Sequence, residues 1–412
     1  MMRKFFTLLA CIGILGIGWT GLPLVLNYFS IGLIIISAIY FGFPKAHDKN
    51  TAAGPLIFMI LLSTMVDIAL IQDRMRESFG RRLSYIQEVI PIYSGNLFTT
   101  DASLFIINDL VGMTKWISAL LFFPMLFGFN SKRQQVNIKL LLNIWILAVI
   151  INVSVAILNS RGLVFSFVSN DVSEEIGANR FSGLSSHPNH LSTVISLTLP
   201  LALYAIQNSK FPKLNYFIVP YLLTGQLLTG SRIGLISFAF ALLFGFKFVL
   251  RISTNRYIGQ FLALIILTIF VMPNFSLGPD LFGSRLFSGG EGVLQSNTAR
   301  LALAQQGFAD FIGDPMVGIG PRAFKSSHNI FLQLLASLGI LGFLAFMYLL
   351  KQSVGVSTYK DSFTYALRIS ILSILVTGIF SNGLADFFIY LPFGAILGTI
   401  SRRRVIPESR TI

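Results

Sequence analysis

Long apolar runs separated by shorter polar segments make up most of the chain. Runs of about 20 apolar residues are long enough to cross the hydrocarbon core of a bilayer as α-helices. The pattern predicts about twelve such helices, over residues 5–20, 22–43, 54–72, 103–128, 138–159, 189–207, 214–229, 231–250, 257–274, 329–350, 364–381 and 384–400. We therefore expect an all-α, polytopic membrane protein whose residues 1–412 form a single membrane domain.

Three of the polar segments are long enough to hold functional groups, and they span residues 73–102, 160–188 and 275–328. In the first, apolar residues recur at steps of three and four, which fits an amphipathic helix in the membrane interface and a solvated helix equally well. In the largest, 275–328, we expect short helices, one of them over 299–312 with its N-cap within 296–298 and its end at Gly313. Residues 317–321 should then form a turn.

Composition and charge agree with a lipid environment. Of all residues, 54% are hydrophobic and only 12% are charged, about half the charged fraction of a soluble domain. If the N-terminus is cytoplasmic, every cytoplasmic loop holds at least two basic residues, and the only acidic residues on that side are Asp48, Asp361 and Glu408. The net charge of +14 is therefore mainly a topology signal. We expect both termini in the cytoplasm, 275–328 outside, and no nucleic-acid partner.

The predicted outer face is poor in common catalytic side chains. The chain's single cysteine, Cys11, lies in an apolar run and cannot form an intrachain disulfide. The histidines outside are His187, His190 and His328. The informative basic residues on that face are Arg180, Arg232, Arg285, Arg300, Arg322 and Lys325.

The polar stretch from Arg180 to His190 leads directly into the apolar run 189–207. Pro188 suits the first helical turn, where its missing N–H does no harm, and a helix N-terminus beside an arginine is a favourable place for an anion. A capped helix with a solvated arginine would give the same pattern. Arg232 lies in a turn too tight to leave the membrane surface, so it either faces a polar cavity or extends to the lipid headgroups.

A second polar stretch precedes the apolar run 329–350. Ser327 or Asn329 can cap this helix, and His328 would then project from the helix start. The ordinary pKa of histidine, near 6.5, suits this residue to accept a proton at neutral pH. A histidine in such a position is more often structural than catalytic, and the arginines on the same side are what favour chemistry.

These residue types favour a phosphate-bearing substrate. Guanidinium groups bind phosphate through two parallel hydrogen bonds and stay charged at every accessible pH, so gathered arginines suit a diphosphate. A metal site would need carboxylates or histidines at ligand spacing. His187 and His190, with Asp171, Glu174 and Glu175 nearby, indicate such a site only weakly, so we expect no metal and no cofactor.

Several stretches together resemble the bacterial O-antigen ligase and O-antigen polymerase family. The resembling residues are Arg180-Phe181-Ser182-Gly183 with His187-Pro188-Asn189, then Gly230-Ser231-Arg232, Arg300, Gly318-Ile319-Gly320, and His328-Asn329 followed after nine residues by Gly339-Ile340-Leu341-Gly342. This last pattern is the most specific, and the likeness covers residues 160–350. Residues 1–150 match only in hydrophobicity. We expect Gly339 and Gly342 to let another helix approach closely.

The resemblance implies a metal-independent glycan transferase in the bacterial inner membrane, surrounded by membrane lipids, with its active face in the periplasm. The donor would be a glycan on undecaprenyl diphosphate, and the acceptor a sugar hydroxyl of lipid A–core for a ligase or of another repeat unit for a polymerase. The catalytic residues would be His328, Arg300 and Arg180, and His328 would orient or deprotonate the acceptor hydroxyl. The diphosphate would be held by Arg180, Arg232, Arg300 and Arg322. The supporting residues, on the acceptor side, would be Asn329, His187 and Asn189.

The complete pattern from His328 to Gly342 favours the ligase over the polymerase. A third alternative is a flippase or transporter, in which the same arginines bind a lipid diphosphate without breaking a bond. Transporters often contain paired broken helices in two repeated halves, and the sequence gives no sign of them. The ionisable residues Asp67, Asp109 and Lys115 lie within predicted helices, where they either form packing pairs or line a lipid path.

Overall fold

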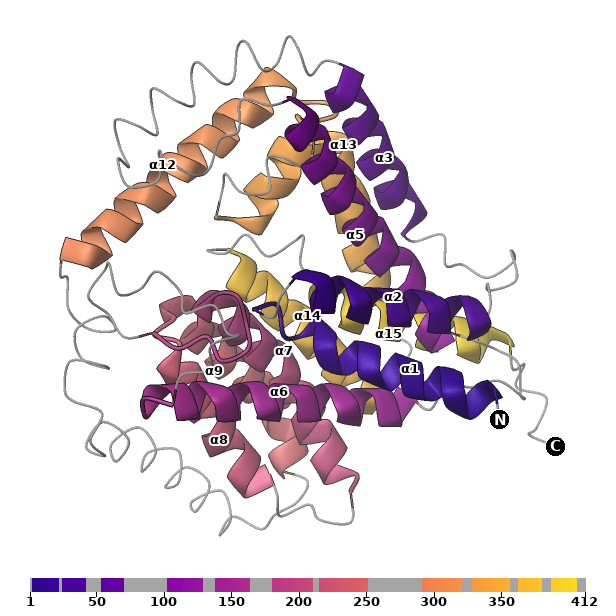
Figure 1. Ribbon diagram of the computed structural model, residues 1–412, viewed down its shortest axis with the longest axis vertical. Helices are drawn as coiled ribbons and strands as arrows, with labels where there is room; N and C mark the ends of the chain where they lie inside the picture. The colour runs from indigo at the N-terminus through magenta and orange to yellow at the C-terminus, as the bar shows by residue number, and fades with distance from the viewer. Residues whose placement is uncertain are drawn as a thin grey trace.

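The structure is a computed structural model of the chain that describes residues 2–21, 24–41, 53–69, 102–128, 138–163, 180–209, 215–250, 291–320, 328–355, 362–379 and 387–405. Within these residues every regular element is a helix, as the sequence predicts (Figure 1). The helices are α1 (Met2–Ile17), α2 (Leu24–Phe41), α3 (Gly54–Ala69), α5 (Ala102–Gly128), α6 (Ile138–Ser160), α7 (Pro188–Gln207), α8 (Asn215–Leu228), α9 (Arg232–Leu250), α12 (Glu291–Gly313), α13 (Ile330–Val354), α14 (Ser362–Gly378), the 3-10 helix η8 (Phe387–Tyr390) and α15 (Leu391–Val405).

Each predicted membrane helix that falls on described residues corresponds to an observed apolar helix, with ends that differ by a few residues. Three of the described helices, α6, α7 and α13, are long and apolar enough to cross a membrane, and the fully described apolar stretches of the other helices are shorter. The predicted span 257–274 and the predicted amphipathic helix within 73–102 lie outside the described residues. The structure therefore supports the all-helical membrane fold.

Helix α12 corrects one prediction. It begins at Glu291 rather than after an N-cap at 296–298, so those three residues lie inside the helix. Serine, asparagine and threonine favour helix starts but are tolerated within helices. The helix ends at Gly313, as predicted, and residues 314–320 form a turn.

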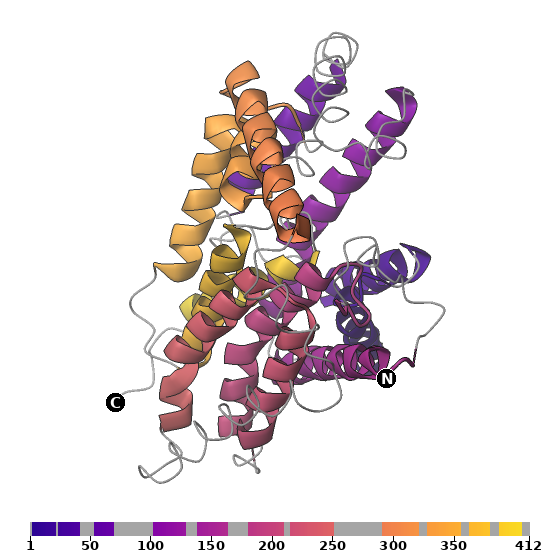
Figure 2. The ribbon, with the colours of Figure 1, turned by 90° about the vertical axis from the view of Figure 1, so that its left-hand side faces the viewer.

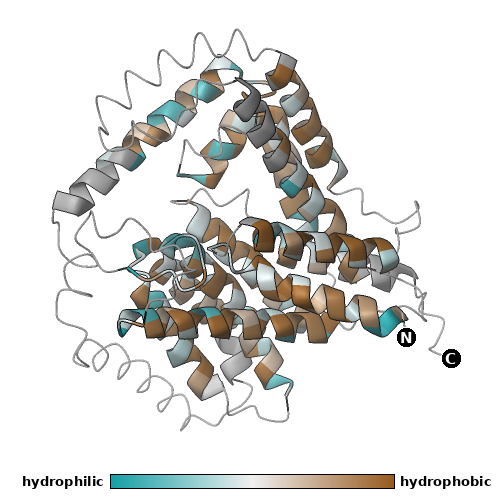
Figure 3. Cartoon of the chain, viewed as in Figure 1, coloured by the Kyte–Doolittle hydropathy of each residue, from teal (hydrophilic) through white to brown (hydrophobic). Residues whose placement is uncertain are grey.

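Apolar side chains lie both in the core and on the surface of the bundle (Figure 3). Trp145 and Phe123 are fully buried, whereas Phe217 and Leu243 are about 70% exposed (71% and 70%). Exposed apolar side chains of this size are what a lipid-facing surface requires. Lys115 lies with its ammonium 5.6 Å from the centre of the Tyr28 ring, and the side chains of Asp67 and Asp109 lie outside the described part of the chain.

The ends of several described helices lie together in two groups. One group contains the end of α1, the starts of α7 and α13, and the end of α14, and Asn329 donates from its Nδ2 to the Ile379 carbonyl across the last two (2.9 Å). The other contains the end of α7 and the start of α14, where the rings of Tyr204 and Phe363 lie in tilted contact with their centres 5.3 Å apart. Figure 2 shows α7, α8 and α9 running side by side. The charge distribution predicts that the first group faces outward.

Helix α13 is broken at Gly339, and the turn that follows α12 fills the break. In a continuous helix, the amides of Ile340 and Leu341 would donate to the carbonyls of residues 336 and 337. Here they donate instead to Pro315 (2.8 Å) and Met316 (3.4 Å). The released carbonyls of residues 336 and 337 accept from the amides of residues 319 (2.9 Å) and 320 (3.0 Å). Two lost helical bonds are thus replaced by four bonds between the turn and α13.

This junction also corrects the expectation for the glycines. The chain that approaches Gly339 is the backbone of the α12–α13 connection, at Met316, and not another helix. Gly339 has φ 64° and ψ −169°, a region essentially confined to glycine, and Gly318 has φ 74° and packs against the Ser337 backbone. A β-carbon at Gly342 would overlap the Leu338 side chain across the break. The glycines therefore provide the backbone conformation and the space that the break in α13 requires.

Replacing Gly339 with alanine should destabilise the fold. The backbone conformation alone should cost about 1–3 kcal/mol, and the added methyl group would overlap the Met316 carbonyl. The thermal unfolding midpoint in detergent should fall, together with the yield of monodisperse protein. Gly32→Ala is the matched control, because a β-carbon at Gly32 in α2 meets nothing within 4 Å. Equal midpoints for the two variants would contradict the structural role of the break.

Candidate functional site

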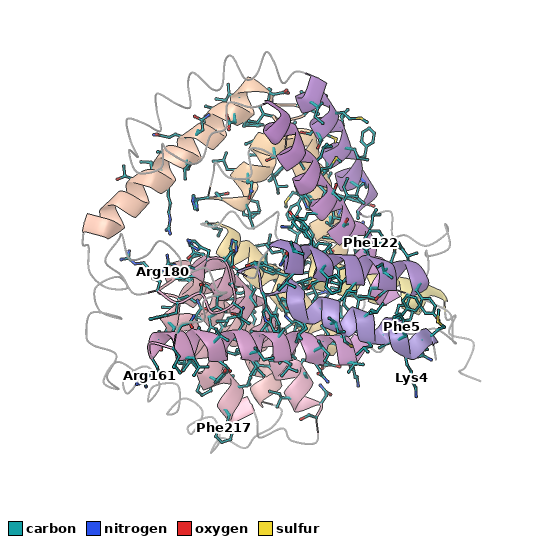
Figure 4. The ribbon with its side chains drawn as sticks, viewed as in Figure 1. Lys4, Phe5, Phe122, Arg161, Arg180 and Phe217 are labelled. Atoms are coloured by element: carbon teal, nitrogen blue, oxygen red, sulfur yellow. The ribbon has the colours of Figure 1, made fainter. Side chains whose placement is uncertain are left out.

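Arg180 is fixed against the turn between α8 and α9. Its Nε donates to the Thr229 carbonyl (2.8 Å) and its Nη2 donates to Oδ1 of Asn189 (2.7 Å). The aliphatic part of the side chain lies over Gly230, where a β-carbon would come within 3.5 Å of the arginine Cγ. Gly230 has φ 57°, which lets the chain turn directly from α8 into α9. Arg180 is therefore positioned by protein contacts before any ligand binds (Figure 4).

Asn152, a buried residue of α6, holds the loop that carries Arg180. Its Oδ1 accepts from the Leu184 amide (2.7 Å) and its Nδ2 donates to Oγ of Ser185 (3.0 Å). On the other side of the loop, the Gly21 amide after α1 donates to the Leu184 carbonyl (2.8 Å). Sequence analysis missed Asn152, although an asparagine within an apolar run is a signal that could have singled it out. Buried hydrogen bonds of this kind restrict the loop to one conformation.

His187 is the N-cap of α7, and Pro188 is the first residue of the helix, as predicted. The imidazole Nδ1 accepts from the Asn189 amide (3.0 Å). A backbone N–H can only donate, so Nδ1 carries no proton and the neutral ring bears its proton on Nε2. His190, one turn along, contacts Oγ of Ser186 through its Nδ1 (2.9 Å).

His328 immediately precedes the cap of α13. Asn329 is the N-cap, as one of the two predicted alternatives has it, and its Oδ1 accepts from the amides of Phe331 (2.9 Å) and Leu332 (3.0 Å). His328 itself has φ 44°, a left-handed conformation that is uncommon for residues other than glycine. Its Nδ1 is buried and has no hydrogen-bond partner among the described residues. A strained backbone and an unpaired buried nitrogen are features typical of functional positions.

The pKa values of His187 and His328 show which charged groups lie near these two histidines. Burial, followed by electrostatic repulsion from Arg180, His190, His328 and Arg300, lowers the pKa of His187 to about 2. Burial, followed by the charge of Arg300, lowers the pKa of His328 to about 4. The folded chain thus brings the loop before α7, the start of α13 and the middle of α12 to one place. At neutral pH this group contains two permanent arginine charges and two neutral imidazoles.

Other predicted site residues have different positions. Arg232 is the first residue of α9 and is exposed, and it is not among the charges that act on His187 or His328. Asn189 lies beside Arg180, and Asn329 serves as a helix cap. Arg322 lies outside the described residues. The described part of the chain contains no group of three or more histidine, cysteine or acidic side chains that could hold a metal ion.

Comparison with known families gives the site its context. Residues 217–347 match the family model described as O-antigen ligase. This region is an O-antigen ligase domain. It includes α8, α9, α12 and most of α13, and so carries Arg232, Arg300 and His328. A search of curated proteins finds no match.

The O-antigen ligase domain does not include Arg180 or His187, which precede it in the sequence. The structure connects them to it, because Arg180 donates to Thr229 within the domain and His187 lies in the field of Arg300 and His328. The match supports the O-antigen ligase or polymerase type for residues 217–347, and together with the apolar helices it suggests a multi-pass membrane protein. The resemblance found in the sequence is thus confirmed.

Histidine titration tests the electrostatic arrangement directly. The chain has four histidines, so NMR of the imidazole ¹³Cε1 groups in detergent can follow each one, with assignment from His→Gln variants. The signals of His187 and His328 should stay constant between about pH 5.5 and 8, the range in which an ordinary histidine titrates. Arg300→Gln should raise both pKa values, because a protonated imidazole is repelled less once that charge is gone.

The control for that experiment is Arg161→Gln. Arg161 is an exposed arginine after the end of α6 and is not among the charges that act on either imidazole. A His328 pKa near 6.5 in the unaltered protein, or one that does not respond to Arg300→Gln, would contradict the arrangement.

Proposed function

We propose that the protein is an O-antigen ligase: a membrane glycosyltransferase that moves a glycan from undecaprenyl diphosphate to a sugar hydroxyl of lipid A–core, on the periplasmic face of the inner membrane. The observation that carries the proposal is the grouping of Arg180 and Arg300 with the neutral imidazoles of His187 and His328. The O-antigen ligase domain supports the same class of donor.

The two arginines suit the leaving group. A glycosyl diphosphate already carries a good leaving group, so the reaction needs no nucleotide and chiefly needs stabilisation of the negative charge that grows on the departing diphosphate. Guanidinium groups held in advance supply this without rearranging during the reaction. Arg180 is held in this way by Thr229 and Asn189. Nε2–H of His187, whose tautomer is set by Asn189, is a further neutral donor for a phosphate oxygen.

His328 suits the acceptor. In the proposed step, the acceptor oxygen forms a bond to the anomeric carbon, and its proton passes to an unprotonated nitrogen of His328. The bond from the anomeric carbon to the diphosphate oxygen breaks, and the diphosphate leaves with the electron pair. Direct attack from the opposite face inverts the anomeric centre. The buried Nδ1 of His328 has no partner among the described residues, which is consistent with a nitrogen reserved for a substrate.

A pKa of about 4 makes His328 a weak base in the absence of substrate. The donor corrects this, since a bound diphosphate places negative charge beside Arg300, the group that lowers the pKa of His328 together with burial. Binding of the donor therefore raises the pKa of His328 toward the working pH, where a general base is most effective. The imidazole becomes an effective proton acceptor only when a donor is present.

Polymerisation of repeat units is the alternative. The pattern from His328 to Gly342 favours the ligase by resemblance, but the observed role of its residues is architectural: Asn329 caps α13 and Gly339 breaks it. Such an architecture suits transfer to either acceptor. A flippase would use the arginines but would need no proton acceptor. The acceptor must therefore be identified by experiment.

Variants of the purified enzyme test the chemistry. With a lipid-linked glycan donor, His328→Ala should lower kcat by about 10²-fold or more, the usual contribution of a proton-transfer group. Arg180→Lys and Arg300→Lys should also lose most activity, because lysine keeps the charge but loses the two-pronged geometry. Arg161→Lys should retain full activity. Transfer should continue in EDTA and without ATP; dependence on added magnesium would count against the arginine-based mechanism.

The product of a deletion strain separates ligase from polymerase. Polymer growth needs only carrier-linked repeats, which remain available without a ligase. Deletion should therefore leave lipid A–core without O-antigen, while long glycan accumulates on the lipid carrier. Gel analysis of lipopolysaccharide, with a separate assay of carrier-linked glycan, measures both. Core bearing a single repeat unit would instead identify the polymerase, and absence of lipopolysaccharide from the host would remove the ligase assignment.

A further inference from the structure

Helix α12 has an inverted distribution of side chains. Three of its large apolar residues point away from the protein: Leu301, Phe308 and Ile312 are 62%, 56% and 61% exposed. At steps of seven and four residues, these side chains form one stripe along the helix. The opposite face, toward the protein, contains Asp310, which is 7% exposed and accepts from Nε2 of Gln306 (2.8 Å). A helix on the surface of a water-soluble protein shows the reverse arrangement.

We propose that α12 lies in the outer membrane–water interface, with the stripe of Leu301, Phe308 and Ile312 against the acyl chains of the same bilayer that the spans cross. The stripe is narrow, and the polar residues Thr298 and Gln305 are exposed beside it. A helix with one apolar stripe and low overall hydrophobicity is suited to lie in the interface rather than to cross the membrane. Helix α12 is not one of the three described helices that are long and apolar enough to cross a membrane.

The stripe is continuous with the lipid-facing side of a membrane span. Met316, which follows the helix and is 54% exposed, accepts at its carbonyl from the Leu341 amide of α13. Leu341 and Leu344 are themselves exposed and belong to a helix long and apolar enough to cross the membrane. Exposed apolar side chains therefore lie on both sides of the junction between α13 and α12, two helices that Figure 1 shows next to each other; Figure 3 colours both by hydropathy. Lipid that covers the outer part of α13 would cover the stripe as well.

The interfacial position of α12 would also determine which way Arg300 points. Leu301 follows Arg300 directly, so their side chains point about 100° apart around the helix. With Leu301 against lipid, Arg300 turns toward the protein, where its charge acts on His187 and His328. Among described elements α12 packs chiefly on α13. The bilayer would thus supply the second surface that fixes the rotation of α12 about its axis. This inference concerns position and holds whichever acceptor the enzyme uses.

Fluorescence quenching in proteoliposomes tests the placement without any substrate. The single native cysteine allows a Cys11→Ala background, into which Phe308→Cys or Ile312→Cys is introduced and labelled with an environment-sensitive fluorophore. Vesicles contain phosphatidylcholine and phosphatidylglycerol, with or without a nitroxide near the top of the acyl chain. An interfacial helix buries its apolar face about 5–10 Å below the headgroups. Both probes should therefore be quenched strongly by the nitroxide lipid and weakly by aqueous iodide.

Thr298→Cys is the matched control, since Thr298 is an exposed residue of the same helix on the polar side of the stripe. Its probe should show the opposite preference, with stronger quenching by iodide. Two results would overturn the proposal. Equal, strong iodide quenching at all three positions would place the stripe in water. Disulfide-linked pairs of the Phe308→Cys variant, with no nitroxide quenching, would place it against a second copy. Gel filtration before reconstitution establishes that each variant is folded.

Discussion

The break in α13 is the constraint from which the rest of the site follows. A membrane cannot solvate free backbone groups, so a helix that opens within or near the bilayer must find other partners for its amides and carbonyls. The 314–320 turn supplies them, with four hydrogen bonds to residues 336, 337, 340 and 341. Because that turn directly continues α12, the bonds determine where α12 leaves α13. The position of Arg300 near His328 is therefore a consequence of how one helix is interrupted.

The two halves of the site are held in different ways. Arg180 and His187 are fixed from several sides, by the α8–α9 turn, by Asn189 and by Asn152 below the loop. Arg300 is carried by α12, which among the described elements packs chiefly on α13. The lowered pKa of His187 needs both halves, since the charges of Arg180 and Arg300 both act on its ring in addition to burial. The site is thus a property of the assembled bundle rather than of any one segment.

The helices and some of their ends and caps could be predicted from the sequence, because they depend on residues close together in the chain. Apolar runs located helices such as α6 and α13, Gly313 marked the end of α12, and Asn329 was one of two predicted caps. Sequence analysis failed where distant segments decide the outcome. The spacing of Gly339 and Gly342 is compatible with helix contact and with a broken helix, and only the approach of Met316 distinguishes them. The neutrality of the histidines is equally invisible in sequence, because it results from burial among residues more than a hundred positions apart.

Arg180 and His187 are held from several sides, whereas Arg300 is carried by a helix that packs chiefly on α13, and this difference affects how the site would bind its donor. A lipid-linked diphosphate arrives along the membrane with its acyl chain in the bilayer, and its negative charge must come between two positive arginines that repel each other in its absence. The half that contains Arg180 is the more rigid one, because hydrogen bonds hold both the arginine and its loop. The half on α12 can adjust, because among the described elements α12 packs chiefly on α13. Adjustment to donors of different size is therefore expected at α12, while Arg180 and His187 keep the diphosphate at a constant position.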